Sequence, residues 1–131
     1  MPRWLPLLLL LGCSSTRSPE KVADRFVDKY YVEFDHSSAL ALAGGVAKLR
    51  LDAELSLVGA ARRGTAPGSH AARVYYERTG VSGSGTQRQA GYTLRIKPQG
   101  GKEFQRTVQI ELAEEPDGTW RVTRFNETTP R

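Results

Sequence analysis

The chain has 131 residues, of which 39% are hydrophobic and 25% charged, and its formal net charge is +5. This composition is typical of a globular protein and excludes an intrinsically disordered chain. The length fits one domain, large enough to need no disulfide or metal for stability. The only cysteine, Cys13, has no second cysteine to pair with inside the chain,.

An unbroken apolar run, Leu5–Leu11, ends in Gly12 and Cys13. The run is too short for a membrane span, which needs about 20 residues, and is typical of a secretory signal. Leu10, Leu11, Gly12 and Cys13 resemble the lipobox of bacterial lipoproteins. This resemblance implies that residues 1–12 are a signal peptide and that Cys13 becomes lipidated. A start codon assigned too late would explain the short leader, and a free cysteine placed there by chance is the alternative.

Residues 13–17 are then expected to form a short tether, and residues 18–131 one folded domain close to the bilayer. Ser14 follows the cysteine, whereas in many Gram-negative lipoproteins an aspartate at this place resembles an inner-membrane retention signal. We therefore expect a protein of the bacterial cell envelope, anchored in the outer membrane and facing the periplasm.

The first half of the domain predicts helices. Ser18 can cap a helix over Pro19–Val32, in which apolar residues recur every four positions,. Asp35–Ser38 predicts a turn with a second cap, followed by a short helix over residues 39–43 and a break at Gly44-Gly45. A longer helix should then run to between Gly59 and Gly64, with these side chains facing inward: Val46, Leu49, Leu55 and Val58.

The second half shows the alternating pattern of strands. The predicted strands centre on Val74–Tyr76, on residues 92–97, on Phe104–Leu112 and on Trp120–Phe125, and Gly80–Gly85 is expected to be a loop. Phe125 has the opposite parity to Trp120 and Val122, so we expect a bulge near Arg124 that returns it to the core. Helices followed by hairpins predict an α+β fold, with the helices on one face of an antiparallel sheet of about four strands.

Three features together resemble the nuclear transport factor 2-like domain: the Tyr30-Tyr31 end of the first helix, the small residues of the second, and the closing Pro116–Val122 segment. The resemblance implies a strongly curved sheet that wraps around the helices as a cone with a pocket. Enzymes of this superfamily resemble ketosteroid isomerases, polyketide cyclases and dehydratases, in which Asp, His and Tyr side chains in the cone perform acid–base chemistry.

On this resemblance, a pocket would use Tyr30, Tyr31, His36 and Asp52. The residues themselves favour a structural interpretation. The two tyrosines have core spacing, His36 lies in a capping turn, and Asp52 lies between charged neighbours on a solvated helix face. We therefore assign no catalytic residue and do not expect an enzyme.

Metal and cofactor chemistry find little support in the sequence. The two histidines, His36 and His70, both lie in predicted loops, and no thiolate is available as a ligand,. The glycine-rich segment Gly80–Gly85 lacks the pattern of a phosphate-binding loop. We expect no metal and no cofactor.

Positive charge is concentrated between Gly59 and Arg106. This segment contains nine basic residues and only two acidic ones, Glu77 and Glu103. The hypothesis is a basic sheet face that contacts anionic head groups, a polysaccharide or an acidic protein, because long-range attraction favours such partners. An envelope location argues against nucleic acid, and a merely solvated face is the alternative. The residues proposed for this face are Arg73, Arg88, Arg95 and Lys97.

The favoured interpretation is a lipid-anchored envelope protein with a non-enzymatic binding or assembly role. The first alternative is a pocket protein for a small apolar ligand, or a weak acid–base enzyme of the polyketide-cyclase or isomerase type. The second is a self-associating scaffold, a homodimer that pairs through the sheet.

Overall fold

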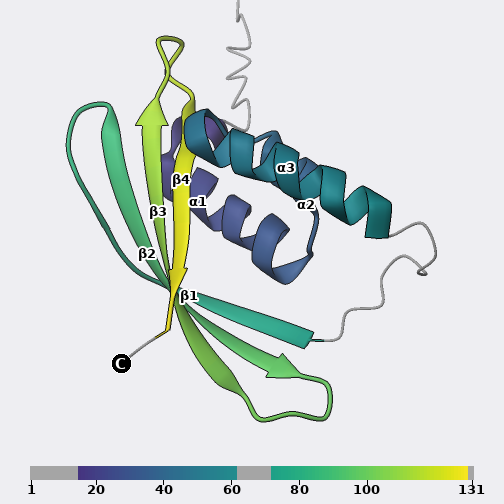
Figure 1. Cartoon of the computed structure of the whole chain (residues 1–131). Coiled ribbons are helices and arrows are strands. Elements are labelled where there is room, and N and C mark those ends of the chain that lie inside the picture. The colour runs from purple at the N-terminus through teal and green to yellow at the C-terminus, as the bar shows by residue number, and fades with distance from the viewer. Residues whose placement is uncertain (1–14, 62–71, 130–131) are drawn as a thin grey trace, which may run out of the picture.

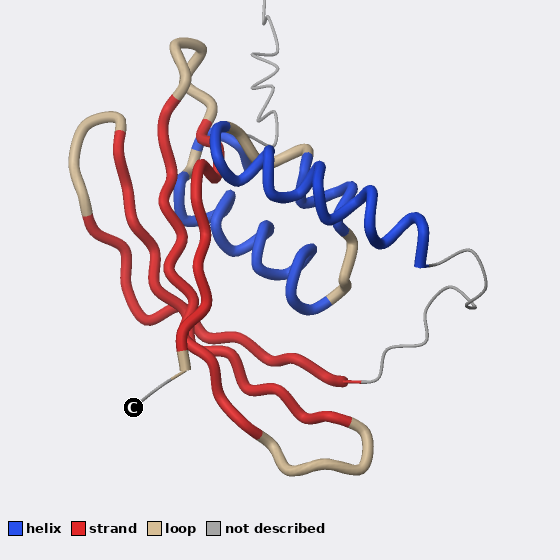
Figure 2. The backbone as a smooth tube through the Cα atoms, viewed as in Figure 1, coloured by secondary structure: helices blue, strands red, loops and turns tan. Residues whose placement is uncertain are grey.

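The structure is a computed structural model that describes residues 15–61 and 72–129. Helices lie against one face of a strongly bent sheet, and the other face of the sheet is uncovered (Figures 1 and 2). The predicted α+β architecture is therefore confirmed. The predictions for the signal peptide, for Cys13 and Ser14, and for His70 fall outside the described residues. The elements are η1 (Ser15–Arg17), α1 (Pro19–Val27), η2 (Asp28–Val32), α2 (His36–Leu40), α3 (Gly45–Ala61), β1 (Ala72–Ser82), β2 (Gln87–Pro98), β3 (Phe104–Glu114) and β4 (Trp120–Thr128).

The first helix occupies the predicted span, but its last turn is wider than an α-helix. The Ser18 side chain accepts a hydrogen bond from the Lys21 backbone N–H, which caps α1, and η2 continues it as a π-helical turn. The insertion of such a turn changes which side chains share a face. Here Tyr30 and Tyr31 come side by side, with ring centroids 4.7 Å apart.

The segment Ser15–Arg17, predicted as part of a short tether, is a 3₁₀ turn that packs against α1 and β4. The second helix also begins earlier than predicted. The Asp35 carboxylate accepts a hydrogen bond from the Ser38 backbone N–H, so α2 starts at His36, within the predicted turn. An N-cap satisfies amide groups of the first turn and so defines where a helix begins.

The inward face of α3 differs from the prediction. Ala47 and Leu51 are buried, whereas Val46 and Leu49 are 51% and 71% exposed. The segment before the helix fixes its rotation, because the Gly44 N–H donates to the Val122 carbonyl oxygen of β4. Of the other residues predicted inward, Leu55 is half-buried, and the side chain of Val58 lies outside the described part.

The sheet has the order β1-β2-β3-β4, and every neighbouring pair is antiparallel. The prediction of a loop over Gly80–Gly85 is wrong for its first half, because β1 extends to Ser82. A bulge between Arg78 and Gly80 restores pairing, with Gly80 opposite Gly91. Unpaired backbone groups are costly, so the bulge allows the glycine-containing segment to stay in the ladder.

The predicted bulge in the last strand is confirmed. Pairing shifts between Glu111 and Leu112 of β3, opposite Arg124 and Val122, which turns Phe125 inward until it is only 2% exposed. The core between helices and sheet then consists of large side chains from both layers. Its largest fully buried members are Tyr92, Phe26, Phe125, Leu51, Leu94, Ile110, Leu112, Val22, Val27, Val108 and Val122.

Candidate functional site

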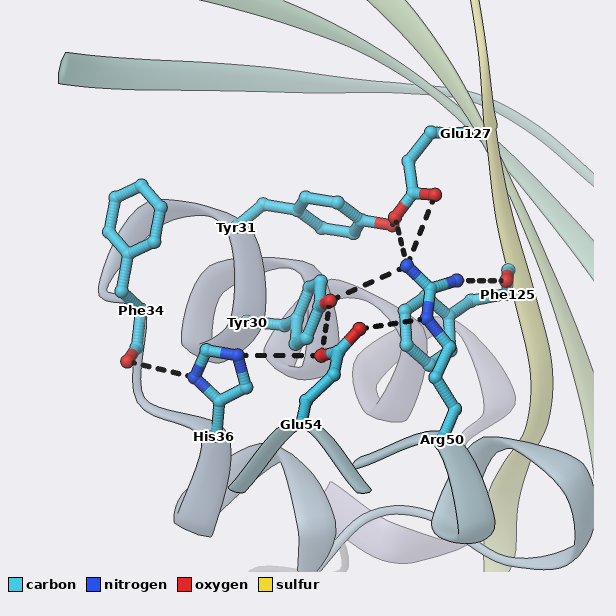
Figure 3. A network of polar contacts seen from close by, with 8 residues as sticks. All are labelled: Tyr30, Tyr31, Phe34, His36, Arg50, Glu54, Phe125 and Glu127. Atoms are coloured by element: carbon cyan, nitrogen blue, oxygen red, sulfur yellow. Dashed lines mark hydrogen bonds and ion pairs between the residues drawn. The ribbon is translucent and has the colours of Figure 1, made fainter. Parts of the chain in front are cut away.

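Polar side chains from η2, α2, α3 and β4 meet beside the aromatic end of the core (Figure 3). Glu54 of α3 is at the centre of this polar network. Its carboxylate accepts hydrogen bonds from the Tyr30 hydroxyl at 2.6 Å and from Arg50 Nε at 3.0 Å. Nε2 of His36 lies 3.4 Å from the same carboxylate, and Nδ1 lies 3.3 Å from the Phe34 carbonyl oxygen.

Arg50 connects this carboxylate to the sheet. Its guanidinium donates to the Phe125 carbonyl oxygen at 2.9 Å and to the Glu127 carboxylate at 3.0 Å, and it lies 4.0 Å from the centre of the Phe125 ring. Tyr31 donates its hydroxyl proton to Glu127. One cation thus holds two carboxylates from α3 and β4, and each carboxylate also accepts from a tyrosine.

Burial raises the pKa of both tyrosine hydroxyls far above the usual value near 10, and hydrogen bonding to the carboxylates adds to the effect. Desolvation disfavours a phenolate, and a neighbouring carboxylate repels one. Tyr30 and Tyr31 therefore remain protonated hydrogen-bond donors over the physiological range. This arrangement keeps both carboxylates fully hydrogen-bonded inside a half-buried site.

Three of the four residues proposed for a pocket come together here, namely Tyr30, Tyr31 and His36. Asp52 does not join them: it is exposed, and helical geometry places it about 160° around α3 from Glu54. Arg50 and Glu54 were not among the predicted site residues, although their four-residue spacing on a helix is a recognisable sign of an ion pair. Glu127 gave no local signal, since it is 77 residues from its arginine partner.

The space that the resemblance assigned to a pocket is filled by the chain's own side chains. Phe26 and Trp120 are buried, and Tyr30 stacks on Phe26 with ring centroids 5.7 Å apart. Phe125 meets the Phe26 ring edge-on at 4.9 Å. Aromatic pairs in such geometries stabilise a core.

Within residues 15–61 and 72–129, no group of three or more His, Cys, Asp or Glu side chains lies close enough together to hold a metal ion. None of the helices described is long and apolar enough to cross a membrane.

Alternation along the strands divides the four proposed basic contact residues between two faces. Arg73, Arg95 and Lys97 lie on the uncovered face, where Arg73 stands directly opposite Lys97 and Tyr75 opposite Arg95. Arg88 has the other parity: it lies over the Trp120 ring, 5.2 Å from its centre, and donates to backbone carbonyl oxygens of the β1–β2 turn region. Arg88 is therefore not part of the same surface.

We call Arg73, Tyr75, Arg95 and Lys97 the basic end of the sheet. The Arg95 guanidinium lies 5.2 Å from the centre of the Tyr75 ring and 3.9 Å from Glu103. A shallow hollow of about 430 Å³ opens beside them, lined by Ala72, Arg73, Tyr75, Lys97, Pro98, Gln99 and Gly100. Other basic residues of the segment are used elsewhere. Arg78, for example, pairs with Asp24 of α1 at 2.8 Å.

The chain resembles known proteins in its structure and not in its sequence. No protein-family model and no curated protein sequence matches the chain. A ketosteroid isomerase-like protein from Erwinia carotovora atroseptica superposes with a TM-score of 0.62 at 11% identity, over 90% of this chain and 98% of that one. A putative calcium/calmodulin-dependent protein kinase type II association domain from Thiobacillus denitrificans gives 0.62 at 12% identity, over 87% and 96%. At such identities only the architecture is shared: the chain has a nuclear transport factor 2-like α+β fold, as its sequence pattern predicted.

Proposed function

We propose that the chain is a lipid-anchored protein of the bacterial cell envelope that acts by binding, with the basic end of its sheet as the contact surface for a negatively charged partner. The anchor is the lipidated Cys13 expected from the sequence. A non-catalytic role is supported by the polar network, whose tyrosines, carboxylates and arginine satisfy one another, and by the filled core beneath it.

The observation that carries the proposal is the facing pair Arg73 and Lys97. Both side chains are exposed, they are direct cross-strand neighbours, and neither has an acidic partner among the described residues. Like charges directly opposite each other destabilise a sheet. A bound carboxylate, phosphate or sulfate group would turn this repulsion into two charge-assisted hydrogen bonds.

Tyr75 and Arg95 complete the surface beside this pair. Tyr75 is 46% exposed although it belongs to a strand, and its ring is held against the Arg95 guanidinium. Aromatic residues and arginine are enriched in binding surfaces, where they combine apolar contact area with hydrogen bonding. The hollow beside them would accept part of a sugar ring or an acidic side chain.

The contact surface is tested with Arg73→Gln/Lys97→Gln, which removes two positive charges. The control, Lys21→Gln/Arg25→Gln, removes two from the exposed side of α1. Binding to polygalacturonate is measured over a range of salt. We expect about a tenfold or greater loss for the first variant, since each hydrogen bond to a charged group contributes roughly 1.5–3 kcal/mol, and little loss for the control. Equal affinities for both variants would show that the pair is only solvated.

The anchor is tested separately by mass spectrometry of the N-terminus of the membrane-extracted protein. We expect cleavage before Cys13 and the added mass of a lipid. An unmodified Met1, or cleavage at another position, would exclude this anchor.

A further inference from the structure

The side of α3 that faces away from the sheet is apolar. Val46, Leu49 and Leu57 are 51%, 71% and 72% exposed, and Ala53 between them is exposed as well. With 3.6 residues per turn, these positions fall on one side of the helix and span roughly 17 Å along it. We call these four residues the outer stripe of α3.

A helix on the surface of a water-soluble domain normally presents polar side chains to solvent. In α3 the polar residues Lys48, Asp52 and Ser56 occupy one flank, between the outer stripe and the side that packs on the sheet through Ala47 and Leu51. The helix therefore has two apolar sides. The sheet and α2 cover one of them, and no other described element covers the second.

The N-terminal end of the described chain lies near the beginning of α3. The turn η1 packs against β4, and Arg17 lies next to Gly118, just before that strand. The residues that start α3 contact the same strand, where the Gly44 N–H donates to Val122 and Gly45 lies beside Thr123. A single residue separates Cys13 from η1, so a lipid on Cys13 would hold this end within roughly 7 Å of the bilayer.

We infer that the outer stripe of α3 lies in the lipid bilayer surface, with the helix parallel to the membrane plane. This inference rests on the lipid anchor of the proposed function. Apolar helix faces of this kind insert shallowly at the boundary between head groups and acyl chains, and they give an anchored protein a second, orienting contact. Lys48 and Asp52 on the flank stay in the aqueous head-group layer.

This orientation restricts the partner of the basic end. In Figure 1 α3 lies above α1, whereas the start of β1 and the β2–β3 hairpin turn lie in the lower part of the bent sheet. Arg73 and Lys97 lie on the uncovered face of the sheet, opposite the helices, so with α3 on the membrane they would face the aqueous side. Their anionic partner is therefore a polysaccharide or protein of the aqueous space, and lipid head groups of the same bilayer are excluded.

The test places an environment-sensitive fluorophore (NBD) on single cysteines of the lipidated full-length chain, reconstituted in vesicles of phosphatidylethanolamine and phosphatidylglycerol. Ala53→Cys reports the outer stripe, its neighbour Asp52→Cys the flank, and Gln105→Cys the uncovered sheet face. We expect blue-shifted emission, and quenching by nitroxide-labelled lipid, at position 53 alone. Equal, water-like emission at positions 53 and 52 would overturn the inference.

A charge test uses Leu49→Glu/Leu57→Glu, which should abolish the blue shift at position 53. The control, Ser37→Glu/Ser56→Glu, adds the same two charges at exposed polar sites and should keep it. If the shift at position 53 occurs without vesicles and grows with protein concentration, a second copy covers the stripe and the inference is wrong.

The experiments distinguish a missing lipid on Cys13 from a missing contact between the outer stripe and the bilayer. If mass spectrometry finds Cys13 unmodified, the proposed function fails at that point. The fluorescence comparison is then repeated with Cys13→Ser, held to the same vesicles by an N-terminal histidine tag and nickel-chelating lipid. Water-like emission at position 53 in that experiment refutes the contact between α3 and lipid.

Discussion

Replacing Arg50 by methionine tests whether the polar network stabilises the fold. The substitution keeps most of the aliphatic length and removes the guanidinium that joins Glu54, Glu127 and the Phe125 carbonyl oxygen. Two carboxylates, each with 27–29% of its side chain exposed, would then lie close together without a cation.

The magnitude follows from the burial of the partners. Loss of one partner of a buried ion pair costs about 3–5 kcal/mol, whereas exposed pairs contribute about 0–1 kcal/mol. Arg50 itself is 35% exposed, so this network lies between those limits. We expect Arg50→Met to lower the free energy of unfolding by about 2–3 kcal/mol.

Urea denaturation followed by tryptophan fluorescence and circular dichroism measures this loss. Arg25→Met is the matched control, because Arg25 is exposed on α1 and should change stability by less than about 0.5 kcal/mol,. Adding Glu54→Gln and Glu127→Gln to Arg50→Met should restore part of the loss, since the uncompensated charges disappear. A loss below about 0.5 kcal/mol for Arg50→Met would refute the view that the network stabilises the junction of α3 and β4.

Alkaline titration followed by phenolate absorbance should show three tyrosines that ionise only as the protein unfolds. Their folded-state pKa values are raised above the unfolded value of 10.0. Their contribution to stability is therefore complete below pH 10 and is lost as the pH rises further. Ordinary titration of all five tyrosines in the folded protein would contradict this prediction. The three are Tyr30, Tyr31 and Tyr92,. At the β1–β2 turn, Gly83→Ala should destabilise the protein by about 1–3 kcal/mol, because φ is +107° and the new Cβ would lie 2.6 Å from the Gln87 carbonyl oxygen,. Thermal unfolding should show this loss, whereas Gly80→Ala, which enters open space, should change little; similar melting temperatures for both variants would be inconsistent with strain at Gly83.

Among these features, the last strand shows how much the local pattern could determine. Trp120 and Val122 share one parity and Phe125 has the other, and a large aromatic residue has a strong tendency to be buried. A bulge was the one local change that could bury all three side chains, and it lies where the pattern predicted. The caps at Ser18 and Asp35 were equally local, because a side chain that bonds to an amide three residues ahead can be recognised in the sequence,.

Alternation could also have separated Arg88 from Arg95 and Lys97. Positions 88 and 95 differ by an odd number in one continuous strand, so their side chains point to opposite faces. The prediction began this strand near Tyr92, whereas β2 begins at Gln87. Its early start depends on pairing with β3, where Arg88 stands opposite Leu112, and that partnership is not visible in either segment alone.

The sequence by itself determined the order of helices and strands, the caps, the last bulge and the α+β class, because each depends on residues within a few positions of one another. Only the tertiary structure decided which apolar side of α3 is covered. Both sides have helical spacing, and the choice was made by the backbone bond from Gly44 to Val122. The ion pair between Arg50 and Glu127 was also decided by the tertiary structure. The two residues are 77 positions apart, and ionic partners that only the fold brings together leave no periodic pattern in the sequence.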